Sequence, residues 1–167
     1  MTRPREAARR PAMQISDFLS PDRVLVDFRA AGKAALLDDL ARRVAPASGV
    51  GAEKIAAALA AREGLGSTGV GHGVALPHAR IAGLAGFIGL FARLASPIAF
   101  EAIDAAPVDL VFLLLIPAEA GSAHLAALAA ISRRLREDGV AARLRAARGP
   151  AEAHAVLTGA GEAPRGR

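Results

Sequence analysis

Residues 62–80, REGLGSTGVGHGVALPHAR, contain the side chains of this sequence that are best suited to chemistry. The glycines at positions 64, 66, 69, 71 and 73 let the backbone adopt positive φ and approach a ligand closely. Ser67 and Thr68 add hydroxyl groups to this loop, and Pro77 fixes the backbone immediately before His78. A mobile, hydroxyl-bearing loop beside a rigidly held imidazole is suited to handling an anion.

The glycines at 64–69 also match G-x-G-x-x-G, the fingerprint of dinucleotide-binding domains, which must follow a strand and open a helix. Here the order is reversed, because a helix is predicted before the loop and a short strand, Val74–Leu76, after it. A P-loop requires a lysine, and the loop has none. The G-x-S-x-G motif of serine hydrolases needs glycine two residues before the serine, but Leu65 occupies that position before Ser67. The sequence therefore does not support nucleotide binding or serine hydrolysis.

The four histidines, at positions 72, 78, 124 and 154, do not have the spacing of a metal site, and the chain contains no cysteine. We therefore expect no metal and no cofactor. A single histidine nucleophile remains, since neutral imidazole attacks a phosphoryl group without a metal. Loop N–H groups, the Ser67 and Thr68 hydroxyls and the Arg62 guanidinium are candidate donors to the phosphate oxygens. From these residues alone, a structural histidine beside a turn and a solvated Ser-Thr loop remain alternatives.

Strands and helices alternate along the chain around these residues. Strands are predicted at Val24–Phe28, Phe87–Leu94 and Val108–Ile116, and helices at about 36–44, Ala52–Arg62, Ser122–Leu135, Val140–Ala147 and Ala151–Leu157. We expect Pro46 to close the first helix and residues 97–100 to form a turn. Arg62 falls on the inward stripe of its helix, and His124 begins the apolar stripe of a later helix. Because two strands are apolar throughout, helices must cover both faces of the sheet, which predicts a single-domain α/β three-layer sandwich.

The net charge of +5 is concentrated at the two ends of the chain. Residues 1–10 carry +3 and residues 161–167 carry +1, so the rest is almost neutral. Together with only 4% aromatic residues, this argues against nucleic-acid binding. No apolar run reaches the ~20 residues of a membrane span, and the start lacks a secretory signal, so we expect a cytoplasmic protein without membrane insertion. A domain at 13–158 is predicted between disordered tails at 1–12 and 159–167.

The run from Arg62 to His78 resembles the EIIA domain of the fructose/mannitol class, type 2, of the bacterial phosphotransferase system. Two later segments, SPIAFEAIDAAPVDLVFLLLIPA and HLAALAAISRRL, are especially similar to the nitrogen-regulatory member, EIIA-Ntr. The resemblance implies a mixed central sheet flanked by helices on both faces. It also implies that His78 is phosphorylated by a histidine phosphocarrier protein of the HPr or NPr type, with His124 as a supporting histidine and Arg62 as an active-site arginine.

The function implied is a regulatory phosphocarrier of the nitrogen-related phosphotransferase system, with a phosphohistidine intermediate. Its phosphorylation state would control targets such as potassium transporters or sensor kinases. Ser67, Thr68 and Gly69 are the expected phosphate-binding residues. One alternative is a sugar-specific EIIA that passes the phosphoryl group to an EIIB during fructose or mannitol uptake. A second alternative is a binding module without phosphotransfer.

Overall fold

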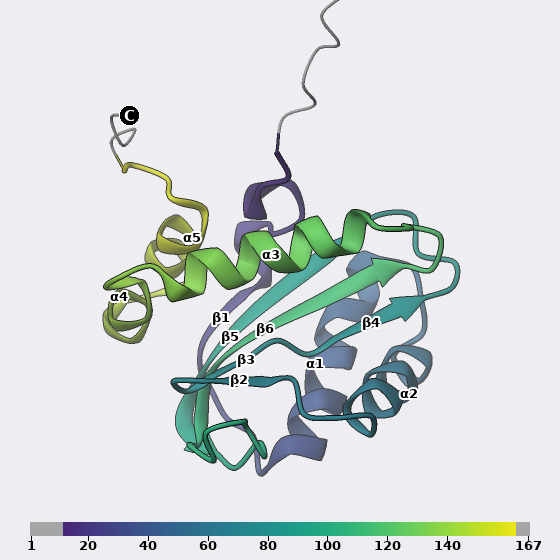
Figure 1. Cartoon of the computed structure of the whole chain (residues 1–167), viewed down its shortest axis with the longest axis horizontal. Helices are drawn as coiled ribbons and strands as arrows, with labels where there is room; N and C mark the ends of the chain where they lie inside the picture. The colour runs from purple at the N-terminus through teal and green to yellow at the C-terminus, as the bar shows by residue number, and fades with distance from the viewer. Residues whose placement is uncertain (1–11, 163–167) are drawn as a thin grey trace, which may run out of the picture.

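The computed structural model describes residues 12–162, and Figure 1 shows how their helices and strands are arranged. In chain order the elements are η1 (Ile15–Asp17), η2 (Pro21–Arg23), β1 (Val24–Phe28), α1 (Lys33–Ser48), α2 (Ala52–Glu63), β2 (Gly69–Gly71), β3 (Val74–Ala75), β4 (His78–Ile81), β5 (Ile88–Ile98), β6 (Val108–Pro117), α3 (Ala123–Arg136), α4 (Val140–Ala146) and α5 (Pro150–Thr158). The predicted alternation of strands and helices is confirmed.

The strands form one mixed sheet in the order β1-β5-β6-β3-β2, with β4 also paired to β6. β5 and β6 are antiparallel, β1 runs parallel to β5, and both β3 and β4 run parallel to β6. The short β2 pairs antiparallel with β3 at the edge of the sheet. This arrangement confirms the mixed central sheet.

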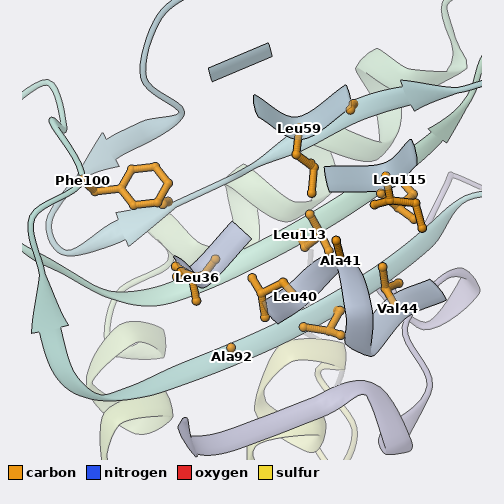
Figure 2. Close-up of a cluster of buried hydrophobic side chains, with 14 of the residues drawn as sticks. Leu36, Leu40, Ala41, Val44, Leu59, Ala92, Phe100, Leu113 and Leu115 are labelled. Carbon is orange, nitrogen blue, oxygen red and sulfur yellow. The ribbon is translucent and has the colours of Figure 1, made fainter. Parts of the chain in front are cut away.

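Two hydrophobic clusters lie on opposite faces of the sheet, as the continuously apolar strands predicted. Along β6, Val111, Leu113 and Leu115 contribute to the cluster that includes α1 and α2. The intervening Leu110, Phe112 and Leu114 contribute to the cluster that includes α3, α4 and α5. Figure 2 shows the first cluster, in which Leu36, Leu40 and Val44 of α1 pack against the sheet. The three-layer sandwich is therefore confirmed, and alternate residues of one strand supply both cores.

Two local predictions were wrong. Pro46 does not close the first helix, because α1 continues through it to Ser48 and ends at Gly49, whose φ of 70° is left-handed. A proline in the last turn removes only one backbone N–H, and the left-handed Gly49 then ends the helix. The segment 97–100 is not wholly a turn either, since Ile98 still pairs with Val108 at the end of β5. Burial of Ile98 explains this extension of the strand.

Part of the glycine-rich segment is ordered sheet and not a free loop. Gly69 begins β2 and is buried, and a Cβ built on it would lie 2.7 Å from Cβ of Ala102. Glycine is therefore required there for close packing of two chain segments. This packing places the loop of residues 64–68 against the connection between β5 and β6.

β3 and β4 are two pieces of one line of pairing along β6. Ala75 pairs with Val111 and His78 with Leu114, so the register is unchanged across the break at residues 76–77. Pro77 has no N–H to donate, but its carbonyl accepts from the N–H of Leu114 at 3.0 Å. The first residue after this break is His78, which is thereby fixed at the start of a strand.

Residues 159–162, predicted to begin a tail, form a turn after α5. The carboxylate of Glu162 lies 2.7 Å from the guanidinium groups of both Arg134 and Arg143, and these contacts lower the pKa of Glu162 to about 2. The predicted basic tail, apart from Ala12, and residues 163–167 lie outside the described residues. Among the described residues, no helix has the length and apolar character needed to cross a membrane.

Candidate functional site

The imidazole of His78 is held by its own backbone neighbourhood. Its Nδ1 lies 2.8 Å from the carbonyl oxygen of Leu76. Because a carbonyl oxygen only accepts, Nδ1 carries the proton in this contact. In the neutral ring, Nε2 then has no proton, and its lone pair is available for attack on an electrophile.

Burial also favours the neutral form of this ring. The pKa of His78 is lowered chiefly because the ring is removed from water. The contact with the Leu76 carbonyl opposes this effect, and the positive charge of Arg62 adds to it. A lowered pKa keeps the imidazole unprotonated, and therefore nucleophilic, at neutral pH.

His78 lines a pocket of about 340 Å³ together with Arg62, Ser67 and Thr68. The structure thus brings together four of the predicted site residues, which come from the end of α2, the loop after it and the start of β4. The other lining residues are mostly apolar: Val70, Leu76, Leu128, Ala129 and Ser132. The Arg62 side chain donates from Nη1 to the carbonyl of Gly66 at 2.9 Å, at the edge of this pocket.

The donors predicted for phosphate binding already have partners within the chain. Ser67 Oγ donates to the carbonyl of Phe100 at 2.8 Å and accepts from the N–H of Gly69 at 3.1 Å. The N–H of Thr68 lies 3.2 Å from one carboxylate oxygen of Glu63, and its hydroxyl donates to the other. Each of these groups must exchange a partner before it can reach a bound phosphate.

His124 lies near the start of α3 and does not line this pocket. Its Nδ1 is 2.7 Å from the carbonyl of Gly121 and 2.9 Å from Nη2 of Arg80. The electrostatic effect of His124 is the smallest of the contributions to the lowered pKa of His78. His78 and Arg80 stand two residues apart on β4, so both side chains leave the same face of the strand, toward α3.

Sequence reasoning missed two charged residues behind the loop, Lys33 and Glu63. Lys33 Nζ lies 2.9 Å from Glu63 Oε2, and the two side chains are only 20% and 7% exposed. The ammonium also donates to the carbonyl of Phe100 at 3.2 Å and lies 4.5 Å from the centre of its ring. A signal was available in the sequence. Lys33 places a positive charge at the start of α1, and Glu63 places a negative charge at the end of α2. Each charge has the same sign as the helix dipole at that end, which is unfavourable. Charges in unfavourable positions on their own helices indicate a partner elsewhere.

A larger hollow of about 590 Å³ adjoins the pocket and shares Val70, Leu76 and Ser132 with it. Two arginines line it, Arg136 and Arg145, and Arg145 is already paired with both carboxylate oxygens of Asp109 at 2.9 Å. Within residues 12–162, no group of acidic or histidine side chains could hold a metal ion. His78 and the guanidinium of Arg62 both line the smaller pocket, which is therefore the candidate site.

Comparison with known proteins matches residues 17–160 to the family described as "Phosphoenolpyruvate-dependent sugar phosphotransferase system, EIIA 2". A nitrogen regulatory protein of Bradyrhizobium diazoefficiens is 44% identical over 145 residues, which cover 87% of this chain and 95% of that protein. A fructose-specific EIIA component of Haloferax volcanii is 42% identical over 87 residues, 52% of this chain and 56% of that protein. The crystal structure of nitrogen regulatory protein IIA-Ntr from Neisseria meningitidis matches with a TM-score of 0.83 at 33% identity, covering 86% of this chain and 99% of that one.

Proposed function

Since this chain belongs to the EIIA 2 family of the phosphoenolpyruvate-dependent sugar phosphotransferase system, we propose that it is a regulatory phosphocarrier of the nitrogen-related branch. His78 accepts the phosphoryl group from a histidine phosphocarrier protein of the HPr or NPr type. The observation that carries this proposal is the contact between Nδ1 of His78 and the Leu76 carbonyl, which leaves Nε2 as the nucleophile.

In the transfer, the Nε2 lone pair of His78 forms a bond to phosphorus while the N–P bond of the donor phosphohistidine breaks. The electron pair of that bond returns to the donor imidazole. Nδ1 of His78 keeps its proton throughout, so the ring gains positive character as the new bond forms. The Leu76 carbonyl, 2.8 Å from Nδ1, is placed to stabilise that charge.

The phosphoryl oxygens need positive groups, because this reaction depends mainly on positioning and charge stabilisation. Arg62, an arginine that lines the same pocket, is the proposed group for this purpose. Ser67 needs to exchange only one hydrogen-bond acceptor. Rotation of its hydroxyl would turn the proton from the Phe100 carbonyl toward a phosphate oxygen. The Gly69 N–H and the Thr68 hydroxyl complete the proposed phosphate-binding set, and His124 supports it from the start of α3.

Phosphorylation adds a charge of about −2 to a nearly neutral domain, and a target protein can detect that change. We assign this role to residues 13–158, in the cytoplasm. Targets of the proposed type are potassium transporters or sensor kinases, which would bind one phosphorylation state in preference to the other.

Labelling tests the proposal directly. Wild-type protein incubated with radiolabelled phosphoenolpyruvate, enzyme I and the carrier should gain an acid-labile label, and His78→Ala should gain none. His72→Asn is the matched control, because His72 is exposed and asparagine tolerates its φ of 55°. Full labelling of His78→Ala would overturn the assignment. An unlabelled wild type would leave a binding module without phosphotransfer.

The similarity to a fructose-specific EIIA component favours a second candidate, in which His78 passes its phosphoryl group to an EIIB during sugar uptake. Phosphorylated protein mixed with purified fructose- or mannitol-type EIIB domains separates the two functions. The regulatory proposal expects the label to remain on His78. Rapid transfer of the label to one EIIB would favour the transport function instead.

A further inference from the structure

Glu63 is linked to the imidazole of His78 by hydrogen bonds that run through the backbones of Thr68 and Leu76. The carboxylate accepts from both the N–H and the hydroxyl of Thr68. The Thr68 carbonyl then accepts from the N–H of Leu76 at 2.9 Å, and the Leu76 carbonyl is 2.8 Å from Nδ1 of His78. The group that fixes the imidazole is therefore itself fixed by Thr68, and Thr68 by Glu63.

The carboxylate at the start of this series is well suited to a positioning role. Its side chain is 7% exposed, and Lys33 balances its charge at 2.9 Å. Thr68 is 5% exposed, so water cannot readily replace Glu63 as the acceptor for its N–H and hydroxyl. A buried, neutralised and fully bonded carboxylate has little freedom to move.

The end of α2 also holds the loop on its other side. The Arg62 side chain donates to the Gly66 carbonyl at 2.9 Å, while the adjacent Glu63 holds Thr68. Two consecutive side chains thus fix both ends of a three-residue segment, 66–68, that borders the pocket of His78. Movement of Glu63 would affect the guanidinium and the imidazole together.

We propose that Glu63 is a positioning residue of the phosphoryl-acceptor site, which acts through Thr68 and Leu76 to hold His78 with Nδ1 protonated and Nε2 free. The inference rests on the proposed function of His78. Glu63 does not touch the reacting atoms. It fixes the tautomer and the direction of the ring that does.

Glu63→Gln tests this role with the smallest change of shape. The amide nitrogen of glutamine is a donor, so it faces either a donor of Thr68 or the ammonium of Lys33 and cannot reproduce both contacts. We expect phosphoryl labelling to slow by about 10-fold to 100-fold, which is the effect of a small misplacement of a reacting group. Glu53→Gln is the matched control, because Glu53 lies on the same helix and is exposed.

Thr68→Val provides a second variant if Glu63→Gln does not fold. It removes the hydroxyl contact to Glu63 but keeps the side-chain shape and the backbone N–H. Circular dichroism establishes that each variant is folded before labelling is measured. Because the Thr68 hydroxyl also belongs to the proposed phosphate-binding set, the labelling rate of Thr68→Val does not separate the two roles, and the tautomer of His78 is the readout for this variant.

The decisive measurement is the tautomer of His78, read from the two ring ¹⁵N chemical shifts in long-range ¹H–¹⁵N spectra above pH 7. Wild type should show protonated Nδ1, and both variants should shift toward a mixture of tautomers; a structural role alone would not produce this shift. Unchanged tautomer and labelling rate in the folded variants would overturn the inference. If wild type is never labelled, the proposed function fails, while the tautomer measurement still decides the role of Glu63.

Discussion

Replacing Lys33 by methionine removes the cation that balances the buried carboxylate of Glu63. Methionine retains most of the apolar stem of lysine, so packing beside Phe100 is largely kept. What is lost is the 2.9 Å ion pair, the 3.2 Å contact with the Phe100 carbonyl and the cation over the Phe100 ring. The carboxylate keeps the donors of Thr68 but has no counter-charge.

The magnitude follows from the burial of the two partners. Removing one partner of a fully buried pair costs about 3–5 kcal/mol, whereas an exposed pair contributes at most about 1 kcal/mol. Glu63 is 7% exposed, but Lys33 is 20% exposed, so water partly replaces the lost ammonium. We expect unfolding free energy to fall by about 2–3 kcal/mol, and Tm by roughly 5–10 °C for a domain of this size.

Urea and thermal unfolding followed by circular dichroism measure this change, since the chain has no tryptophan or tyrosine for fluorescence. Lys54→Met is the control, because the ammonium of Lys54 donates to an exposed backbone carbonyl, that of Ala82. The double variant Lys33→Met/Glu63→Gln should recover about 1–2 kcal/mol of the loss, because it removes the uncompensated charge. A decrease below about 0.5 kcal/mol in Lys33→Met, or no recovery in the double variant, would refute the reasoning.

Three further outcomes are expected. Arg62→Ala should slow labelling of His78, or speed hydrolysis of its phosphoryl group, by about 10-fold to 100-fold without unfolding the chain. Rapid-quench labelling measures both rates. Unchanged rates would mean that Arg62 serves only as a cation at the C-terminal end of its helix. The pKa of His78 is lower in the folded state than in the unfolded chain, so the folded state binds a proton at this imidazole less readily. The stability contributed by neutral His78 is therefore complete above pH ~6.5 and declines as the pH falls below that value. Denaturant titrations from pH 8 to 5 should show that decline, reduced in His78→Ala. Gly69→Ala, whose new Cβ would lie 2.7 Å from Ala102, should cost about 1–3 kcal/mol in urea unfolding, and a cost near zero would contradict the close packing at Gly69.

The main features of the fold could be predicted from local patterns. The apolar run of β6 requires cover on both faces of the sheet. The spacing of leucines in α1, and of Leu128, Ile131 and Leu135 in α3, gives the buried sides of these helices. The helix-then-strand order around residues 62–78 excluded a nucleotide loop, and the structure confirms that order. The continuation of the helix past Pro46 was missed, because a proline in the final turn removes only one backbone N–H and need not end the helix.

Sequence alone was enough to propose His78 as the candidate nucleophile and to predict that a rigid strand start follows a glycine-rich loop, because both depend on neighbours along the chain. Only the tertiary structure decided which donors are free. Ser67 pairs with a carbonyl 33 residues away, and Glu63 pairs with Lys33 from another helix. The physical reason is that a polar side chain bonds to whatever group burial brings within 3 Å, and no local pattern specifies that partner.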